Sequence, residues 1–157
     1  MFTDLTSHHI EGFAVMGNTP FSMPLITYVG HFGIGELHQG GCRDGVKVDF
    51  DTIISLYPWE RYDALGATRI EVTMYDASGE VPEVQLDWVA DQIKYFLDLG
   101  QRVLVHCQAG LNRSSLAIAH FFMKHENFTA EEAITLIRKR SPACLCNPDF
   151  EAWLRRR

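Results

Sequence analysis

The sequence of 157 residues contains no long hydrophobic run, and no segment approaches the roughly 18 apolar residues typical of a membrane-spanning helix. Its first residues lack the charged region and apolar stretch of a secretory signal peptide. It has only four cysteines, which at this length fit a reducing compartment better than a disulfide framework. We therefore expect a cytoplasmic protein that is neither secreted nor bound to a membrane.

Positive charge is scarce as well. The chain has 14 lysines and arginines against 20 aspartates and glutamates, which gives a formal net charge of −6. An acidic chain does not offer the broad basic surface that nucleic acids require, nor is it attracted to an anionic membrane. We therefore expect no nucleic-acid partner, and any anion must be bound by a local cluster of groups.

Internal repeats and low-complexity linkers are also absent from the sequence. With 46% hydrophobic residues, the chain can bury one sizeable core but has little material for a second. Residues 1–157 are therefore expected to form a single domain, and we expect a monomer.

Short apolar runs alternate with segments of helical periodicity. Strands separated by helices predict an α/β fold with a central, mostly parallel sheet flanked by helices. The expected strands are Leu25–Val29, Thr52–Leu56, Ile70–Met74 and Arg102–His106. The expected helices are Pro82–Leu99, Ser114–Lys124, Thr129–Arg140, which opens with a capping box, and a short last helix from Asn147 and Pro148.

One segment has distinctive chemistry: an apolar strand leads into His106, Cys107 and a loop that ends at Arg113. A cysteine is nucleophilic only as the thiolate, which a helix N-terminus and converging backbone N–H groups favour. The same N–H groups can bind one anion, and Gly110 permits the tight turn. The residues expected to surround that anion are Gln108, Ala109, Gly110, Leu111, Asn112 and Arg113.

Arg113 identifies the anion. Its planar guanidinium matches two oxygens of a phosphoryl group and stays charged at any working pH. A cysteine and an arginine at this spacing are a weak signal alone, but here a β-branched strand, the histidine, the glycine, Ser114 and a following helix coincide. The sequence therefore predicts a reactive thiolate inside a phosphate-binding loop.

The run His-Cys-Gln-Ala-Gly-Leu-Asn-Arg-Ser, from His106 to Ser114, resembles the signature of the cysteine-dependent protein phosphatases, His-Cys-x2-Gly-x2-Arg-Ser/Thr. The small size is similar to the dual-specificity branch, and the resemblance extends from about Leu25 to Leu154. It implies a single-domain protein-tyrosine-phosphatase-like fold, with the phosphate-binding loop between a strand and a helix, and a metal-independent enzyme.

Cleavage of a phosphoester by a thiolate also needs a proton donor, because an alkoxide or phenoxide leaves poorly. Asp76 ends a strand-like alternating run and opens a loop that contains Gly79 and Pro82. It precedes Cys107 by 31 positions, and the resemblance implies a general-acid aspartate at about that separation. Glu80 on the same loop is the alternative donor.

Two residues are expected to support Cys107. Ser114 lies at the start of the helix, where its hydroxyl can bond to the backbone, and the resemblance implies that it donates to the cysteine sulfur. Both roles can hold together. His106 resembles the family histidine that orders the loop from behind, so we expect a structural hydrogen bond rather than proton transfer to the substrate.

The implied reaction has two steps and needs no metal or other cofactor. Cys107 displaces the substrate oxygen while Asp76 protonates it, and water then hydrolyses the thiophosphate with Asp76 as base. We expect a protein phosphatase that acts on phosphotyrosine and on phosphoserine or phosphothreonine, with phosphorylated proteins as partners. One alternative is a catalytically weak phosphoprotein-binding module.

The other alternative is a phosphatase of a non-protein substrate. An RNA 5′-triphosphate is the example, because Asn112-Arg113 resembles the RNA triphosphatase variant of the motif, although that variant favours histidine where Ala109 stands. An inositol lipid is disfavoured, because the lysines that phosphoinositide-selective relatives carry in this loop are absent.

Three other segments admit more than one interpretation. The glycine-rich stretch Gly30–Cys42 is expected to serve turns and packing, without a nucleotide-binding role or a metal site. The aromatic stretch Tyr57–Tyr62 either walls the substrate entrance or caps the core. Cys144 and Cys146 are structural thiols, or they protect Cys107 by forming a disulfide after oxidation.

The C-terminal region contains the remaining ambiguities. The basic runs Arg138–Arg140 and Arg155–Arg157 are solvated helix ends or a patch that guides a phosphopeptide. Ser141 and Pro142 stand where several relatives have Arg-Pro, and we expect the missing arginine to weaken the support of the loop rather than the chemistry.

Overall fold

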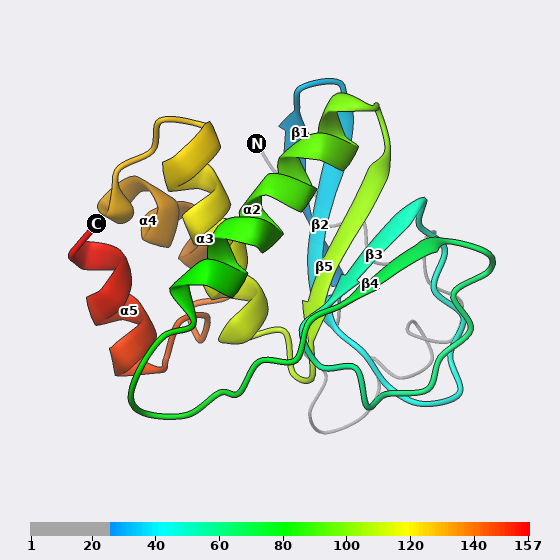
Figure 1. Ribbon diagram of the computed structural model, residues 1–157, viewed down its shortest axis with the longest axis horizontal. Helices are drawn as coiled ribbons and strands as arrows, with labels where there is room; N and C mark the ends of the chain where they lie inside the picture. The colour runs from blue at the N-terminus through cyan, green and yellow to red at the C-terminus, as the bar shows by residue number, and fades with distance from the viewer. Residues whose placement is uncertain (1–25) are drawn as a thin grey trace.

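A computed structural model of the protein describes residues 26–157. Figure 1 shows a sheet on one side of the molecule and a layer of helices on the other. The strands are β1 (Ile26–Phe32), β2 (Gly35–Gly41), β3 (Thr52–Ser55), β4 (Thr68–Glu71) and β5 (Arg102–Cys107). The helices are α2 (Glu83–Asp98), α3 (Arg113–His125), α4 (Ala130–Arg140) and α5 (Pro148–Arg155).

The sheet has the order β1-β2-β5-β3-β4, so β5 lies at its centre. Only the pair β1 and β2 is antiparallel among these strands, which confirms the expected mostly parallel sheet. Because β2, β5 and β3 run in one direction, their carboxyl ends meet at one edge, where Gly41 lies beside Cys107 and Ser55 beside His106. This edge is where ligands bind in open α/β sheets.

Alternation along β5 divides its side chains between two faces. Val103, Val105 and Cys107 pack into the main core, to which the four described helices contribute, whereas Leu104 faces a second cluster on the other side. The second cluster is covered by loop residues such as Val48 and Phe50. Cys107 is thus the last residue of a strand that is buried on both sides.

Of the turns and packing expected for Gly30–Cys42, the turns were wrong for most of its length, and the packing is confirmed. This stretch contains the end of β1 and the whole of β2, and only residues 33 and 34 form the turn between them. Two glycines in the strand allow neighbours to approach closely, since a Cβ on Gly35 would lie 2.7 Å from the Leu97 carbonyl oxygen and one on Gly41 2.5 Å from that of Gln108. A glycine-rich segment can therefore be a strand where another backbone packs against it.

The strand expected at Ile70–Met74 is β4, and it lies earlier in the chain. Pairing between β4 and β3 ends at Glu71, opposite Ser55, because β3 itself ends there. Residues 72–82, which we call the Asp76 loop, then leave the sheet, with Met74 turned into the core. The strands expected near residues 25 and 52 were placed well, apart from Leu25, which lies outside the described residues.

The expected helices are all present. The capping box of α4 is confirmed, with the Thr129 hydroxyl accepting from the Glu132 N–H and the Glu132 carboxylate accepting from the Thr129 N–H. Asn147 caps α5 through its side-chain oxygen, and Pro148 follows at the first helical position. Helix α3 is buried on almost every side from Arg113 to Phe122.

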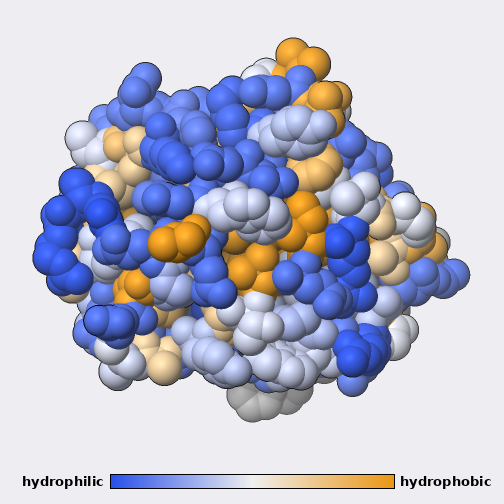
Figure 2. All heavy atoms as spheres, in the orientation of Figure 1, coloured by the Kyte–Doolittle hydropathy of each residue, from blue (hydrophilic) through white to orange (hydrophobic). Residues whose placement is uncertain are grey.

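The surface seen in Figure 2 is mostly hydrophilic, with hydrophobic residues in small, separate patches. Along α2 the exposed apolar residues include Val84, Trp88 and Tyr95. Within residues 26–157, no helix combines the length and the hydropathy needed to cross a bilayer.

Candidate active site

Residues 108–112, which we call the phosphate loop, join β5 to α3 at the carboxyl edge of the sheet. Cys107 precedes the loop and is 2% exposed, and Arg113 follows it as the first residue of α3. Gly110 has a φ of +74°, a left-handed conformation that favours glycine. The predicted strand, loop and helix around Cys107 are therefore confirmed.

The phosphate loop packs tightly against the end of β2. A Cβ on Gly110 would lie 2.7 Å from the Gly41 nitrogen, so both positions need glycine. The buried amide of Gln39, also on β2, donates to the Gly110 carbonyl oxygen at 3.3 Å and to the Ser115 hydroxyl at 2.6 Å. Strand β2 therefore fixes the loop from one side.

Ser114 lies next to the thiol, as predicted. Its hydroxyl oxygen is 3.4 Å from the Cys107 sulfur and 3.4 Å from the Gln39 amide nitrogen. The Gln39 amide nitrogen cannot accept a hydrogen bond, so the Ser114 hydroxyl keeps its own hydrogen for the sulfur. A hydroxyl in this position can stabilise a thiolate.

His106 is fully buried and lies behind the loop. Its Nδ1 is 3.1 Å from the Cys107 carbonyl oxygen, and its Nε2 is 2.8 Å from the Tyr62 hydroxyl. A carbonyl oxygen cannot donate, so Nδ1 has the hydrogen and Nε2 accepts from Tyr62. Burial lowers the pKa of His106 to about 4 and raises the pKa of Tyr62, which keeps both groups neutral.

Arg113 has a buried side chain whose terminal nitrogen donates to the Met74 carbonyl oxygen at 3.1 Å. Its guanidinium carbon lies 5.1 Å from the centre of the Tyr57 ring. Among the described residues, its buried Nε has no hydrogen-bond partner. The guanidinium is therefore fixed by the protein, while its Nε hydrogen remains available for an anion.

Asp76 is exposed, but both of its carboxylate oxygens are held. The amide nitrogens of Asn112 and Asn147 each donate to one oxygen, and both distances are 2.8 Å. Asn147 also donates to the Ala77 carbonyl oxygen at 3.3 Å. Glu80, the alternative donor, makes no such bond to the phosphate loop in the described part of the chain.

An aromatic cluster flanks Arg113 and Asp76. The ring centres of Tyr57 and Trp59 are 4.8 Å apart, and those of Trp59 and Tyr75 are 6.1 Å apart. Trp59 and Tyr75 are largely exposed, at 47% and 69%. Of the two interpretations of this stretch, a wall beside the loop fits Tyr57 and Trp59, whereas buried Tyr62 belongs to the second core cluster.

The four cysteines are free thiols. Cys144 is buried, with its sulfur 3.8 Å from the Gly110 carbonyl oxygen, and Cys146 is exposed beside Asn112. Burial raises the pKa of Cys42, which lies in the second core cluster. In the region that the structure describes, no group of His, Cys, Asp and Glu side chains could hold a metal ion.

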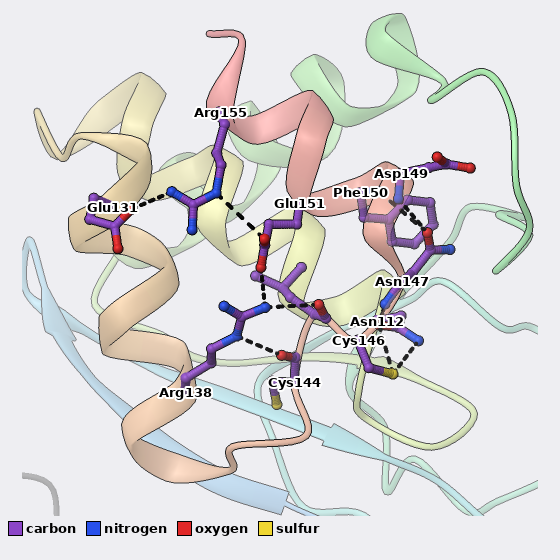
Figure 3. Close-up of polar contacts among 11 residues, drawn as sticks. Asn112, Glu131, Arg138, Cys144, Cys146, Asn147, Asp149, Phe150, Glu151 and Arg155 are labelled. Carbon is purple, nitrogen blue, oxygen red and sulfur yellow. Dashed lines mark hydrogen bonds and ion pairs between the residues drawn. The ribbon is translucent and has the colours of Figure 1, made fainter.

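Arg138 supports the loop, a role that neither interpretation of the basic run Arg138–Arg140 included. Its guanidinium donates to the carbonyl oxygens of Cys144 and Leu145 at 3.2 and 3.0 Å and pairs with Glu151, as Figure 3 shows. The Leu145 N–H in turn donates to the Leu111 carbonyl oxygen at 2.9 Å. An arginine on α4 thus holds the segment behind the phosphate loop, although position 141 has a serine where several relatives have an arginine.

Sequence reasoning also missed Gln39, Tyr62 and Asn147. Gln39 and Tyr62 lie far from Cys107 in the chain, and no local pattern connects them to it. The Asn147-Pro148 pair did indicate a helix start, but that signal accounts only for the hydrogen bonds that the Asn147 side-chain oxygen accepts at the start of α5. The Asn147 amide nitrogen donates to Asp76, which only the folded chain brings close.

Comparison with known proteins places these features in a family. A sequence model described as the dual specificity phosphatase catalytic domain matches residues 42–157. The MAP kinase phosphatase with leucine-rich repeats protein 3 of Dictyostelium discoideum is 30% identical over 82 residues, which cover 50% of this chain and 10% of that protein. Protein 123R of invertebrate iridescent virus 6, a tyrosine phosphatase by name, is 24% identical over 131 residues, 77% of this chain and 91% of that protein.

Solved structures share the fold. The crystal structure of PTPMT1 in complex with PI(5)P has a TM-score of 0.66 at 18% identity, over 84% of this chain and 93% of that chain. At this identity the likeness concerns the arrangement of the sheet and helices.

Proposed function

The chain belongs to the dual specificity phosphatase catalytic domain family and is a cysteine-based phosphatase; from this premise we propose that it hydrolyses phosphotyrosine, together with phosphoserine or phosphothreonine, in protein substrates. Residues 1–157 act as one catalytic domain in this proposal. The observation that carries it is the bond between Asn112 and Asp76, which joins a candidate acid to the loop of the candidate nucleophile.

In the first step the Cys107 sulfur attacks phosphorus, the bond to the substrate oxygen breaks, and Asp76 gives that oxygen a proton. Arg113 and the backbone N–H groups of residues 108–112 hold the other phosphoryl oxygens as charge shifts among them. His106, neutral behind the loop, fixes the backbone of Cys107. The product is an enzyme with phosphate bound to sulfur.

In the second step Asp76, now ionised, takes a proton from water while the water oxygen attacks phosphorus. The phosphorus–sulfur bond breaks, phosphate leaves, and the thiolate of Cys107 returns. The Ser114 hydroxyl, with its hydrogen free of Gln39, donates to that thiolate. Side chains, backbone N–H groups and water supply every group in this cycle, so the proposed reaction requires no metal.

The aromatic cluster supports phosphotyrosine as a substrate. Tyr57 stacks against Arg113, and Trp59 and Tyr75 continue the cluster toward Asp76. A planar leaving group can pack against these exposed rings, whereas the short chain of phosphoserine reaches less of their area.

Two other functions are weighed against this one. A binding module without turnover is disfavoured because Cys107, Arg113 and Asp76 are all present and lie around one loop. A non-protein substrate has some support in the fold, since PTPMT1 was crystallised with PI(5)P. The loop of this chain has no lysine to bind additional phosphates, which favours a substrate with a single phosphoryl group.

The deciding experiment is turnover of p-nitrophenyl phosphate in EDTA by the reduced protein and its Cys107→Ser variant. We expect metal-independent turnover in the parent and a loss of at least about a thousandfold in the variant. An inactive parent, or a fully active variant, would contradict the proposal. Release of the terminal phosphate from triphosphate-ended RNA tests the nucleic-acid alternative on the same samples.

A further inference from the structure

We propose that Asn112 and Asn147 are positioning residues, which together orient the Asp76 carboxyl toward the leaving group. The inference rests on the proposed role of Asp76 as acid and base. It assigns to Asn112 a task beyond lining the phosphate loop, and to Asn147 a task beyond capping α5.

The two amides fix an otherwise exposed carboxyl. Each donates one N–H to a different oxygen of Asp76, and both distances are 2.8 Å. An amide nitrogen cannot accept a hydrogen bond, so the O–H of a protonated Asp76 cannot donate to either asparagine nitrogen. The proton therefore points away from both amides and remains available for the substrate oxygen.

The orientation of each amide is fixed by its other end. The Asn147 oxygen accepts from the backbone N–H groups of Asp149 and Phe150 at 3.0 and 3.3 Å, so its nitrogen must face Asp76. The Asn112 oxygen accepts from the Asn147 backbone N–H at 2.9 Å, with the same consequence. Figure 3 shows the two side chains adjacent at the start of α5.

Asn112 occupies the residue before α3, where asparagine usually caps the helix with its side chain. Here the side chain makes no capping bond, although it is only 8% exposed. Its amide instead reaches Asp76 and the Cys146 sulfur. The usual helix-capping contact is thus replaced by a contact with the candidate acid.

The segment that contains Asn147 is firmly anchored. Arg138 holds its preceding carbonyl groups, the Leu145 N–H bonds to the phosphate loop, and Phe150 is buried in the main core. On its other side, Asp149 accepts from the Gly79 N–H of the Asp76 loop at 3.0 Å. Figure 1 shows this loop passing beside the start of α5. The N-terminus of α5 therefore bridges the two loops.

Asn147→Ser separates the two tasks of this residue. Serine retains an oxygen that caps a helix, but it has no amide N–H that can reach Asp76. Asn112→Ala removes the other amide and tests the same inference where the serine variant folds poorly. Thr129→Ala is the matched control, because it removes the cap of α4 without any contact with Asp76.

The readout compares two substrates. Dinitrophenyl phosphate has a leaving group that departs without a proton, whereas phenyl phosphate needs one. For Asn147→Ser we expect kcat/KM, which reports the first step alone, to fall by about tenfold or more on phenyl phosphate and by less than about threefold on dinitrophenyl phosphate. For Asn112→Ala, whose residue also belongs to the phosphate loop, the loss of kcat/KM on phenyl phosphate should exceed the loss on dinitrophenyl phosphate by at least about threefold. Thr129→Ala should change neither. Equal losses on the two substrates, or no loss, would overturn the inference.

A double variant provides a second readout, in which a purely structural role would cost further activity and a positioning role would not. Adding Asn147→Ser to Asp76→Asn should cost no further activity on phenyl phosphate, because the group that it positions is already absent. A further loss would contradict the positioning role. If Asp76→Asn itself affects both substrates equally, or if the parent is inactive, the proposed function fails, and this outcome is distinct from a failure of the asparagines.

Discussion

The phosphate loop and the Asp76 loop meet at one edge of the sheet, but they are held in different ways. The phosphate loop lies between a central strand and a buried helix, and it packs against the backbone of β2 at Gly41. The Asp76 loop is mostly exposed and is held by side chains of Asn112, Asn147 and Asp149. Backbone packing gives the first loop little freedom, whereas the second depends on a few hydrogen bonds that can be removed singly.

If this contrast holds, a change to the backbone geometry of the phosphate loop has the largest effect. A Cβ at Gly110 would clash with the end of β2, whereas one at Gly45, with a similar φ of +77°, would meet nothing within 4 Å. Gly45→Ala should lower the free energy of unfolding by roughly 1–2 kcal/mol through its left-handed conformation alone.

Gly110→Ala should cost at least about twice as much stability and reduce turnover below about one hundredth. Urea unfolding and p-nitrophenyl phosphate turnover measure the two quantities. Equal destabilisation by both substitutions would mean that the close approach of β2 does not matter.

The buried histidine behind the phosphate loop should make this half of the site sensitive to acid. The pKa of His106 is lowered to about 4 in the folded protein from an ordinary value of 6.5, so the unfolded chain binds a proton first as the pH falls. The stability due to neutral His106 is complete above pH 6.5 and is lost as the pH falls through 4.

Between about pH 7 and pH 4, the parent should lose about 3 kcal/mol more unfolding free energy than His106→Gln. Tyr62→Phe keeps the imidazole and should retain the dependence of the parent. Urea midpoints at several pH values provide the measurement, and parallel curves for the parent and His106→Gln would refute it.

The smallest effect is expected in the aromatic cluster beside the Asp76 loop, where a side chain influences preference rather than stability. Trp59→Ala should lower the ratio of kcat/KM for phosphotyrosyl over phosphothreonyl peptides by about threefold to tenfold. Tyr95→Ala, an exposed aromatic residue on α2, serves as the control and should leave the ratio unchanged. An equal loss on both peptides would show that the Trp59 ring does not contact the leaving group.

The same contrast explains what the sequence could predict. The strand, Cys107, the loop and α3 are consecutive, so their local pattern contained enough information to place them. Asp76 was predicted from its place after a strand-like run and from the separation that the family resemblance implies, but its partners Asn112 and Asn147 come from segments 36 and 71 residues away. Contacts of that kind leave no periodic trace in a single sequence.

Strand β2 shows the other limit of sequence reasoning. Its glycines indicated turns because the backbone freedom of glycine is a local property, which says nothing of a distant backbone that packs against it. Gly41 is required by the carbonyl group of Gln108, which lies 67 positions later in the chain. The Gln39 side chain, whose amide bonds to the loop, was hidden in the same stretch.

The bridge at the start of α5 also has a consequence for the order of events during synthesis. Domains are made from the N-terminus onward, at about 5–20 residues per second. The strands, the phosphate loop and α3 are complete before Asn147 is translated, and α5 is the last described helix to follow. On the proposed mechanism, a nascent chain acquires its thiol site before the contact that orients its proton donor, so it stays a poor catalyst until α5 docks.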